Sequence, residues 1–165
     1  MTFADRVKGV LFLDVKTFEE IEADKTANGQ ALLVVIAASL AAGLGASLRF
    51  GAIGLLRETL GALVGWVMWA GVTYLLGTRV WPDSETRTDM GELLRVIGFS
   101  YAPSFFSIFG VLPRIGGAVR VGVALWLLAT TVLAVRQALD YRSTAKAFLV
   151  VFAGWLIFVL IDWVS

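Results

Sequence analysis

The chain has 165 residues and a net charge of +1, and 58% of its residues are hydrophobic while only 16% are charged. Average soluble domains carry about 25% charged residues, so this composition, with a mean hydropathy of +0.81, indicates an integral membrane protein. The lack of cysteine excludes disulfides, thiolate nucleophiles and cysteine-based metal sites. The lack of histidine removes the commonest general base and metal ligand. We therefore expect no cofactor and no metal, and the charge gives no reason to expect nucleic-acid binding.

Residues 1–29 are predicted to form a short amphipathic arm on the cytoplasmic side. They carry four basic and six acidic residues among regularly spaced apolar ones, without the pattern of a secretory signal peptide. Thr17, followed three residues later by Glu20, predicts a capping box at the start of a second short helix. The apolar side of the arm is expected to rest on the membrane surface or on the helix bundle. A docking arm for a partner is the alternative interpretation.

Residues 30–165 are predicted to form an all-α transmembrane domain of five helices. A membrane-spanning helix needs about 20 apolar residues. The sequence has five apolar runs. The fourth and fifth have only 15 strictly uncharged residues each, but flanking Arg120, Arg136 and Lys146 can extend their charged ends to the interface. A chain of four spans with one re-entrant segment is the alternative. The expected spans are approximately 30–48, 59–78, 94–112, 118–138 and 145–163.

The third run contains a proline near its middle. Pro103 has no amide hydrogen and frees the carbonyl group of Phe99, one turn earlier, while Ala102 before it is disfavoured in helical geometry. We predict a kink or short unwinding centred on residues 99–103, with the hydroxyl groups facing protein rather than lipid. The candidate functional residues at this broken span are Phe99, Ser100, Tyr101, Pro103, Ser104 and Ser107.

Small residues predict where the spans pack, because helices in lipid associate through close backbone approach. The second span contains a GxxxG pair, and the first contains small residues spaced four apart. We expect these faces to pack within the chain rather than form a homodimer seam. The candidate packing residues are Gly61, Gly65, Ala38, Ala41, Ala42 and Gly45.

Lysine and arginine are unevenly distributed between the two sides of a five-span chain. The arm and the loops 79–95 and 136–146 carry ten, whereas the loops 49–57 and 114–120 carry four. The positive-inside rule then places the N-terminus in the cytoplasm and the C-terminus on the periplasmic side.

The sequence predicts no enzyme. Ser100 in "GFSYA" resembles the serine of a membrane-embedded hydrolase, but such a serine needs an adjacent base. The chain has no histidine, no lysine lies within an apolar span, and no aspartate lies in the middle of one. We therefore assign no catalytic residue.

Three stretches resemble the Yip1 family of small multi-span membrane proteins: "LLRVIGFSYAPSFFSIFGVLPRIG" (93–116), "ALWLLATTVLAVRQAL" (124–139) and "STAKAFLVVF" (143–152). The arm, "GVLFLDVKTFEEI" (9–21), is similar to that of bacterial members. The resemblance implies five spans, with the N-terminus cytoplasmic and the C-terminus on the far side. Eukaryotic relatives are linked to Rab GTPases and to traffic between endoplasmic reticulum and Golgi, a role that does not carry over to a bacterial member.

Together these features predict an interaction, accessory or membrane-organising protein of the bacterial inner membrane. Its partners would be the lipid bilayer and another membrane protein or a second copy of itself. A small oligomeric channel or transporter using the broken third span is the alternative. Lipid handling by the arm is neither supported nor excluded.

Overall fold

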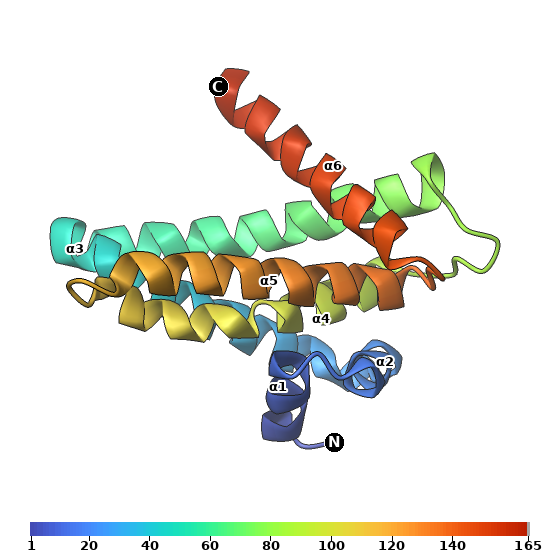
Figure 1. The fold of residues 1–165 in the computed structure, drawn as a ribbon, viewed down its shortest axis with the longest axis horizontal. Coiled ribbons are helices and arrows are strands. Elements are labelled where there is room, and N and C mark those ends of the chain that lie inside the picture. The colour runs from blue at the N-terminus through green and yellow to red at the C-terminus, as the bar shows by residue number, and fades with distance from the viewer. Residues whose placement is uncertain (165) are drawn as a thin grey trace.

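The structure, a computed structural model, describes residues 1–164, without the side chains of residues 45–50, 161, 162 and 164. Most of this part of the chain is helical, and its helices are joined by short turns and by a longer irregular connection at residues 81–89 (Figure 1). Its α-helices are α1 (Phe3–Leu11), α2 (Val15–Ala23), α3 (Asn28–Leu75), α4 (Met90–Ser100), α5 (Gly116–Ala138) and α6 (Thr144–Val164). Two 3₁₀-helices, η1 (Lys25–Ala27) and η3 (Ala102–Val111), and one π-helix, η2 (Leu76–Val80), complete the described fold.

Among the described residues, four helical segments are long and apolar enough to cross a membrane, as expected for a helical membrane bundle. These segments are Lys25–Leu44, Gly51–Val80, Met90–Val111 and Gly116–Ala138. The described part of α6 that is comparably apolar, Thr144–Leu160, is shorter. The fifth span therefore stays a prediction.

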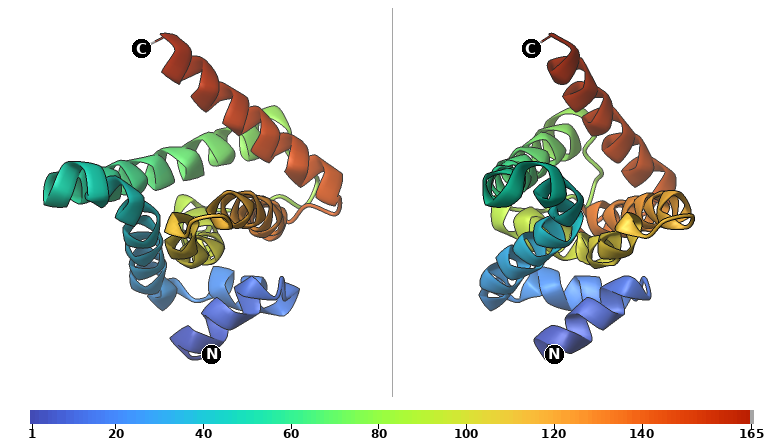
Figure 2. Two further views of the ribbon diagram at one scale, coloured as in Figure 1. Left: turned by 60° about the vertical axis from the view of Figure 1, so that its left-hand side comes forward. Right: turned by 90° about the vertical axis from the view of Figure 1, so that its left-hand side faces the viewer.

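Residues 49–57, which we expected to form a loop, are instead part of α3. The helix has one interruption, at Gly51, whose backbone angles of φ 63° and ψ −154° are non-helical. Five of these nine residues, an alanine, two leucines and two arginines, are strong helix formers, so helical geometry resumes directly after the glycine. The two halves of α3 meet at this bend (Figure 2), and a Cβ added to Gly43 would lie 3.1 Å from Leu55 Cδ1. The turn between the first two apolar runs is a sharp bend at one residue.

The core lies where α4 and η3 pack between α3 on one side and α5 on the other. Its fully buried side chains come from the spans and also from the arm, so both parts share one core. Helix α6 packs on α5 near its start and crosses α3 further along, where Gly154 and Phe158 lie beside Trp69. Its end then leans away from the bundle (Figure 1). The largest fully buried side chains include Phe18, Ile21, Val34, Val35, Leu93, Val96, Ile97, Phe99, Val135 and Leu139.

The arm packs on the bundle, one of the two positions expected for it. Helices α1 and α2 lie beside α4 and α5 (Figures 1 and 2), and the Trp126 indole nitrogen, midway along α5, donates a hydrogen bond of 3.0 Å to the Leu11 carbonyl. The predicted capping box at Thr17 is wrong. Asp14 caps α2 and accepts a hydrogen bond of 2.7 Å from the Thr17 hydroxyl. Thr17 is buried because Gly9 leaves room for it: a Cβ at Gly9 would lie 2.1 Å from Thr17 Oγ1.

Candidate functional sites: the helix break and the arm latch

The backbone changes from α-helix to 3₁₀-helix next to Pro103. Helix α4 ends at Ser100, Tyr101 caps it, and η3 begins at Ala102 with the proline in its first turn. Ser104 donates its backbone amide to the Tyr101 carbonyl at 2.9 Å. Because Pro103 has no amide hydrogen, it cannot continue the α-helical hydrogen bonding of α4. The helix therefore tightens into 3₁₀ geometry rather than opening into a loop.

Hydroxyl groups of α5 satisfy the polar atoms at this break. The Ser100 hydroxyl donates to the Ile97 carbonyl at 2.7 Å and lies 3.3 Å from Thr131 Oγ1. The Thr130 hydroxyl lies 2.8 Å from the Ser100 carbonyl and can donate to it. Sequence reasoning named Ser100 but missed both threonines, although two adjacent threonines inside an apolar run were a visible signal. A buried carbonyl in an apolar setting needs such a donor.

The six candidate residues of the third run do not form one polar site. Phe99, Ser100, Pro103 and Ser104 are buried, whereas Tyr101 and Ser107 are half-buried. Of the six, Tyr101 is the one that lines a described cavity, of about 460 Å³, between α3, α5 and α6. The remaining wall of this cavity is almost entirely apolar. It is formed by Trp69, Ala124, Leu127, Leu128, Thr131, Phe148, Val151, Phe152 and Trp155.

The GxxxG pair of α3 does not pack inside the chain. A Cβ added to Gly61 or Gly65 would meet nothing within 4 Å, so the intramolecular packing that we expected for this pair is absent from the described residues. Ala38 is buried, Ala41 is half-buried and Ala42 is exposed. The surroundings of Gly45 lie outside the described residues.

The close helix approach inside the bundle uses Gly98 of α4 instead. A Cβ at Gly98 would lie 2.8 Å from Ala31 Cβ and 3.1 Å from the Trp66 ring. Trp66 also donates its indole N–H to the Leu94 carbonyl at 3.1 Å. The signal that could have located this contact is the small pair Ala27 and Ala31, four residues apart and both fully buried.

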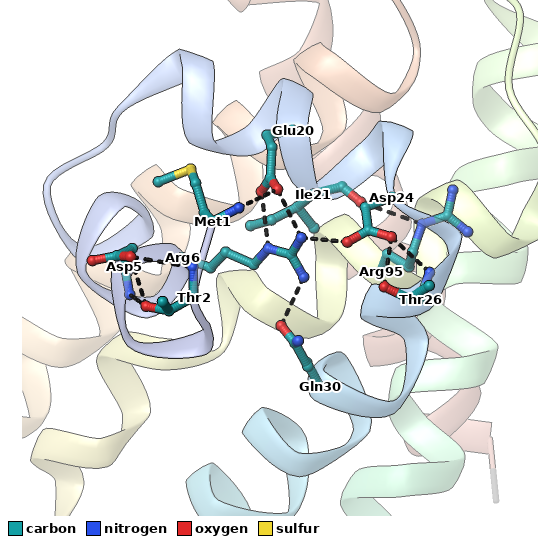
Figure 3. Close-up of polar contacts among 10 residues, drawn as sticks. All are labelled: Met1, Thr2, Asp5, Arg6, Glu20, Ile21, Asp24, Thr26, Gln30 and Arg95. Carbon is teal, nitrogen blue, oxygen red and sulfur yellow. Dashed lines mark hydrogen bonds and ion pairs between the residues drawn. The ribbon is translucent and has the colours of Figure 1, made fainter.

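A buried arginine holds the arm together. The side chain of Arg6 is 3% exposed. Its Nε and Nη2 donate to the two carboxylate oxygens of Glu20 at 2.9 and 2.7 Å, and its Nη1 donates to the amide oxygen of Gln30 at 2.8 Å (Figure 3). Nη2 also pairs with Asp24. We call Arg6, Glu20, Asp24, Gln30 and Arg95 the arm latch.

Hydrogen bonding within the latch changes the pKa values of its carboxyl groups. The Arg6 guanidinium lowers the pKa of Glu20. The Thr26 hydroxyl, together with Arg6, lowers the pKa of Asp24. Both carboxylates therefore stay ionised opposite the buried cation, as a bidentate pair requires.

Arg95 ties the arm to the transmembrane helices. It is 2% exposed, and it donates to the carbonyl oxygens of Ile21 at 3.3 Å and Glu22 at 2.5 Å and to Asn28 Oδ1 at 3.4 Å. From the sequence, Arg95 was only one of the basic residues counted in the loop 79–95. The buried roles of Arg6 and Arg95 were missed, because single arginines among other charges carry no distinguishing pattern.

The carboxyl group of Glu22, next to this contact, is a weaker acid than an ordinary glutamate side chain, because its pKa is raised. Burial, together with nearby Asp140 and Glu92, raises the pKa of its carboxyl group to about 7, and Arg95 opposes the shift. Within the described residues, no cluster of three or more metal-ligating side chains is present.

Comparison with known proteins yields one match. A family model described as the Yip1 domain matches residues 8–164. No curated protein and no solved structure matches the chain.

Proposed function

The chain belongs to the Yip1 family, and from this membership and the open small-residue face of α3 we propose an accessory role. The protein is a non-enzymatic component of the bacterial inner membrane that binds another membrane protein or a second copy of itself. It spans the bilayer five times, with α6 as the last span. Its arm lies on the cytoplasmic side and its C-terminus on the periplasmic side.

The main observation behind this proposal is that Gly61 and Gly65 pack against no other described helix of the chain, since a Cβ at either would meet nothing within 4 Å. Small residues spaced four apart let a second helix approach closely, and in lipid this approach is a main source of helix association. The side chains beside them, Leu60, Val64 and Met68, are 54%, 59% and 46% exposed. This part of α3 is therefore available to a helix from another protein.

The charge distribution supports the orientation. The arm and two loops carry ten of the fourteen lysine and arginine residues, as expected for the cytoplasmic side. The Arg142 and Glu85 side chains of these two loops pair, and Lys146 donates to the Pro82 carbonyl at 2.9 Å. Both loops thus lie at the same end of the bundle, as the five-span topology requires.

A channel or transporter along the broken span is less well supported. The hydroxyl groups of Ser100 and Thr130 bond within the core, and so do not line an open path. The cavity beside Tyr101 is apolar apart from Tyr101, Thr131 and the indole groups. An ion would lose its hydration there without gaining ligands.

Cross-linking in native membranes tests the proposal. The full-length chain and a Gly61→Ile, Gly65→Ile variant are expressed, cross-linked and captured, and cross-linked species are identified by mass spectrometry. We expect one defined cross-linked species with the wild-type chain and its loss with the variant. Gly122→Ile is the matched control, because Gly122 also faces open space but lies on α5. A monodisperse wild-type monomer with no cross-linked species would refute the proposal.

A further inference from the structure

The cavity beside Tyr101 lies within the membrane-spanning part of the molecule. Its lining residues come from the interior of α5 (Ala124, Leu127, Leu128, Thr131) and of α6 (Phe148, Val151, Phe152, Trp155). Trp69 and Tyr101 lie well inside the segments Gly51–Val80 and Met90–Val111. The cavity is therefore expected to lie at the depth of the bilayer hydrocarbon.

The cavity has a closed floor and an open mouth. Thr131 and Val151 at its floor are 8% and 5% exposed. At its mouth, Leu128, Phe148 and Phe152 are 40%, 43% and 45% exposed. The opening between α5 and α6 is continuous with exposed apolar side chains, including Leu125 at 64% and Leu149 at 58%. Hydrocarbon that covers this outer surface reaches the mouth directly.

One wall of the cavity is a row of aromatic rings on α6. Phe148 and Phe152 are stacked, with ring centroids 6.2 Å apart and an interplanar angle of 8°. Trp155 continues the row, 5.9 Å from Phe152. The facing wall on α5 is aliphatic, and Ala124 leaves space there. At the inner side, the Tyr101 hydroxyl has no hydrogen-bond partner among the described residues.

We propose that this cavity is a binding site for one hydrocarbon chain of a membrane lipid, which enters from the bilayer between α5 and α6. Lipid tails are as apolar as the lining, so the hydrophobic effect does not drive this binding. The hydrocarbon chain binds because it supplies van der Waals contacts to cavity walls that otherwise have no partner atoms.

Neither water nor a partner helix fits as well. Apolar cavities of this kind stay dry, because water finds too few polar partners in them. A helix with its side chains is about 10–12 Å across and rises about 5.4 Å per turn. A single turn would therefore already fill a recess of about 460 Å³. A single flexible chain can follow the narrow space to the floor.

A photoreactive lipid tests this site. The full-length protein is reconstituted in vesicles of phosphatidylethanolamine and phosphatidylglycerol that contain phosphatidylglycerol with a diazirine on one acyl chain. After illumination, labelled residues are mapped by mass spectrometry. We expect label at the floor, on Thr131 and Val151, in addition to label on the exposed surface.

Filling the cavity with a larger side chain should reduce lipid labelling of the residues at its floor. Ala124→Phe places a ring in the cavity, and we expect floor labelling to fall roughly tenfold, the equivalent of about 1.4 kcal/mol. Label on Leu125 should be unchanged. Ala118→Phe is the matched control, because Ala118 is an exposed residue of α5 outside the cavity. Leu127→Trp fills the same space from a second position, in case Ala124→Phe fails to fold, which circular dichroism and gel filtration would show.

An unlabelled floor in the wild-type protein would overturn the proposal, and so would equal floor labelling in the wild-type and both filled variants. Floor residues cross-linked to a second copy of the chain would also overturn it. The site does not depend on the proposed accessory function. We expect the Gly61→Ile, Gly65→Ile variant to lose its cross-linked partner while lipid labelling of the cavity floor stays unchanged. We expect Ala124→Phe to leave capture of the partner unchanged. The lipid site and the accessory function can therefore be refuted separately.

Discussion

Arg95 and Glu22, 73 residues apart, are joined by a hydrogen bond of 2.5 Å from the Arg95 guanidinium to the Glu22 carbonyl oxygen. The bond connects the first half of α4 to the end of α2. Because Arg95 is buried and binds backbone carbonyls rather than a carboxylate, its charge is solvated by the arm itself. The arm is therefore an integral part of the bundle.

Replacing Arg95 by methionine should release the arm. The variant loses the donors to the Ile21 and Glu22 carbonyls, and each hydrogen bond to a charged group is worth about 1.5–3 kcal/mol. Hydrogen–deuterium exchange of residues 15–23 in detergent should rise strongly, while exchange in α5 should stay slow. Arg87→Met is the control, because Arg87 is exposed and only its backbone amide makes a hydrogen bond in the described structure. Unchanged exchange in Arg95→Met would show that the latch does not need this residue.

Docking of the arm should weaken as pH rises from about 4.5 to 7. Burial raises the pKa of Glu22 from its ordinary value of 4.5 to about 7 in the folded chain. Across this window the docked arm retains a proton that the released arm gives up, so rising pH favours release. Asp140, Glu92 and Glu19 add to the repulsion of the ionised form, while Arg95 reduces it.

Limited proteolysis of the arm across this pH range measures the effect, with cleavage rates corrected for the pH dependence of the protease on an unfolded peptide. Glu22→Gln should abolish the dependence between pH 4.5 and 7. Glu19→Gln should only weaken the dependence, because Glu19 is exposed, accepts one hydrogen bond from Gln137 at 3.2 Å, and contributes less to the raised pKa of Glu22 than burial, Asp140 and Glu92 do. Below this window, loss of the Arg6 pairs should release the arm as Glu20 and Asp24 become protonated. A flat profile in the wild-type chain would contradict the role of Glu22.

Composition and apolar run length were enough to predict a helical membrane bundle, because the cost of an unpaired backbone in lipid leaves few alternatives. The position of Pro103 indicated the region in which α4 gives way to η3, since proline acts locally. A loop was expected at residues 49–57, which include Gly51, but not a bend at this single residue, because a single glycine in an apolar run also occurs in continuous helices. Polar contacts between distant segments, such as those of Arg6 and Arg95, depend on the assembled fold and leave no local pattern.

Gly98→Ala should destabilise the bundle although alanine is the better helix former. Its new methyl group would lie 2.8 Å from Ala31 Cβ, and overpacking of this kind costs about 1–3 kcal/mol. Gly122→Ala meets nothing within 4 Å and should be neutral or gain up to about 1 kcal/mol. The unfolding temperature in detergent should therefore fall for Gly98→Ala and stay the same or rise for Gly122→Ala. Equal shifts would contradict the close contact of α4 with α3.

Gly51→Ala should disturb the bend in α3. The backbone angles of Gly51, φ 63° and ψ −154°, lie in a region that is accessible essentially only to glycine, and strain there costs about 1–3 kcal/mol. The variant should either unfold at lower temperature or relieve the strain by straightening α3. Because the chain has no cysteine, spin labels on Leu33→Cys and Leu60→Cys report the distance between the two halves without background, and straightening lengthens that distance. Gly61→Ala is the control, since it is helical and faces open space. An unchanged distance and an unchanged unfolding temperature in Gly51→Ala would show that the bend does not depend on glycine.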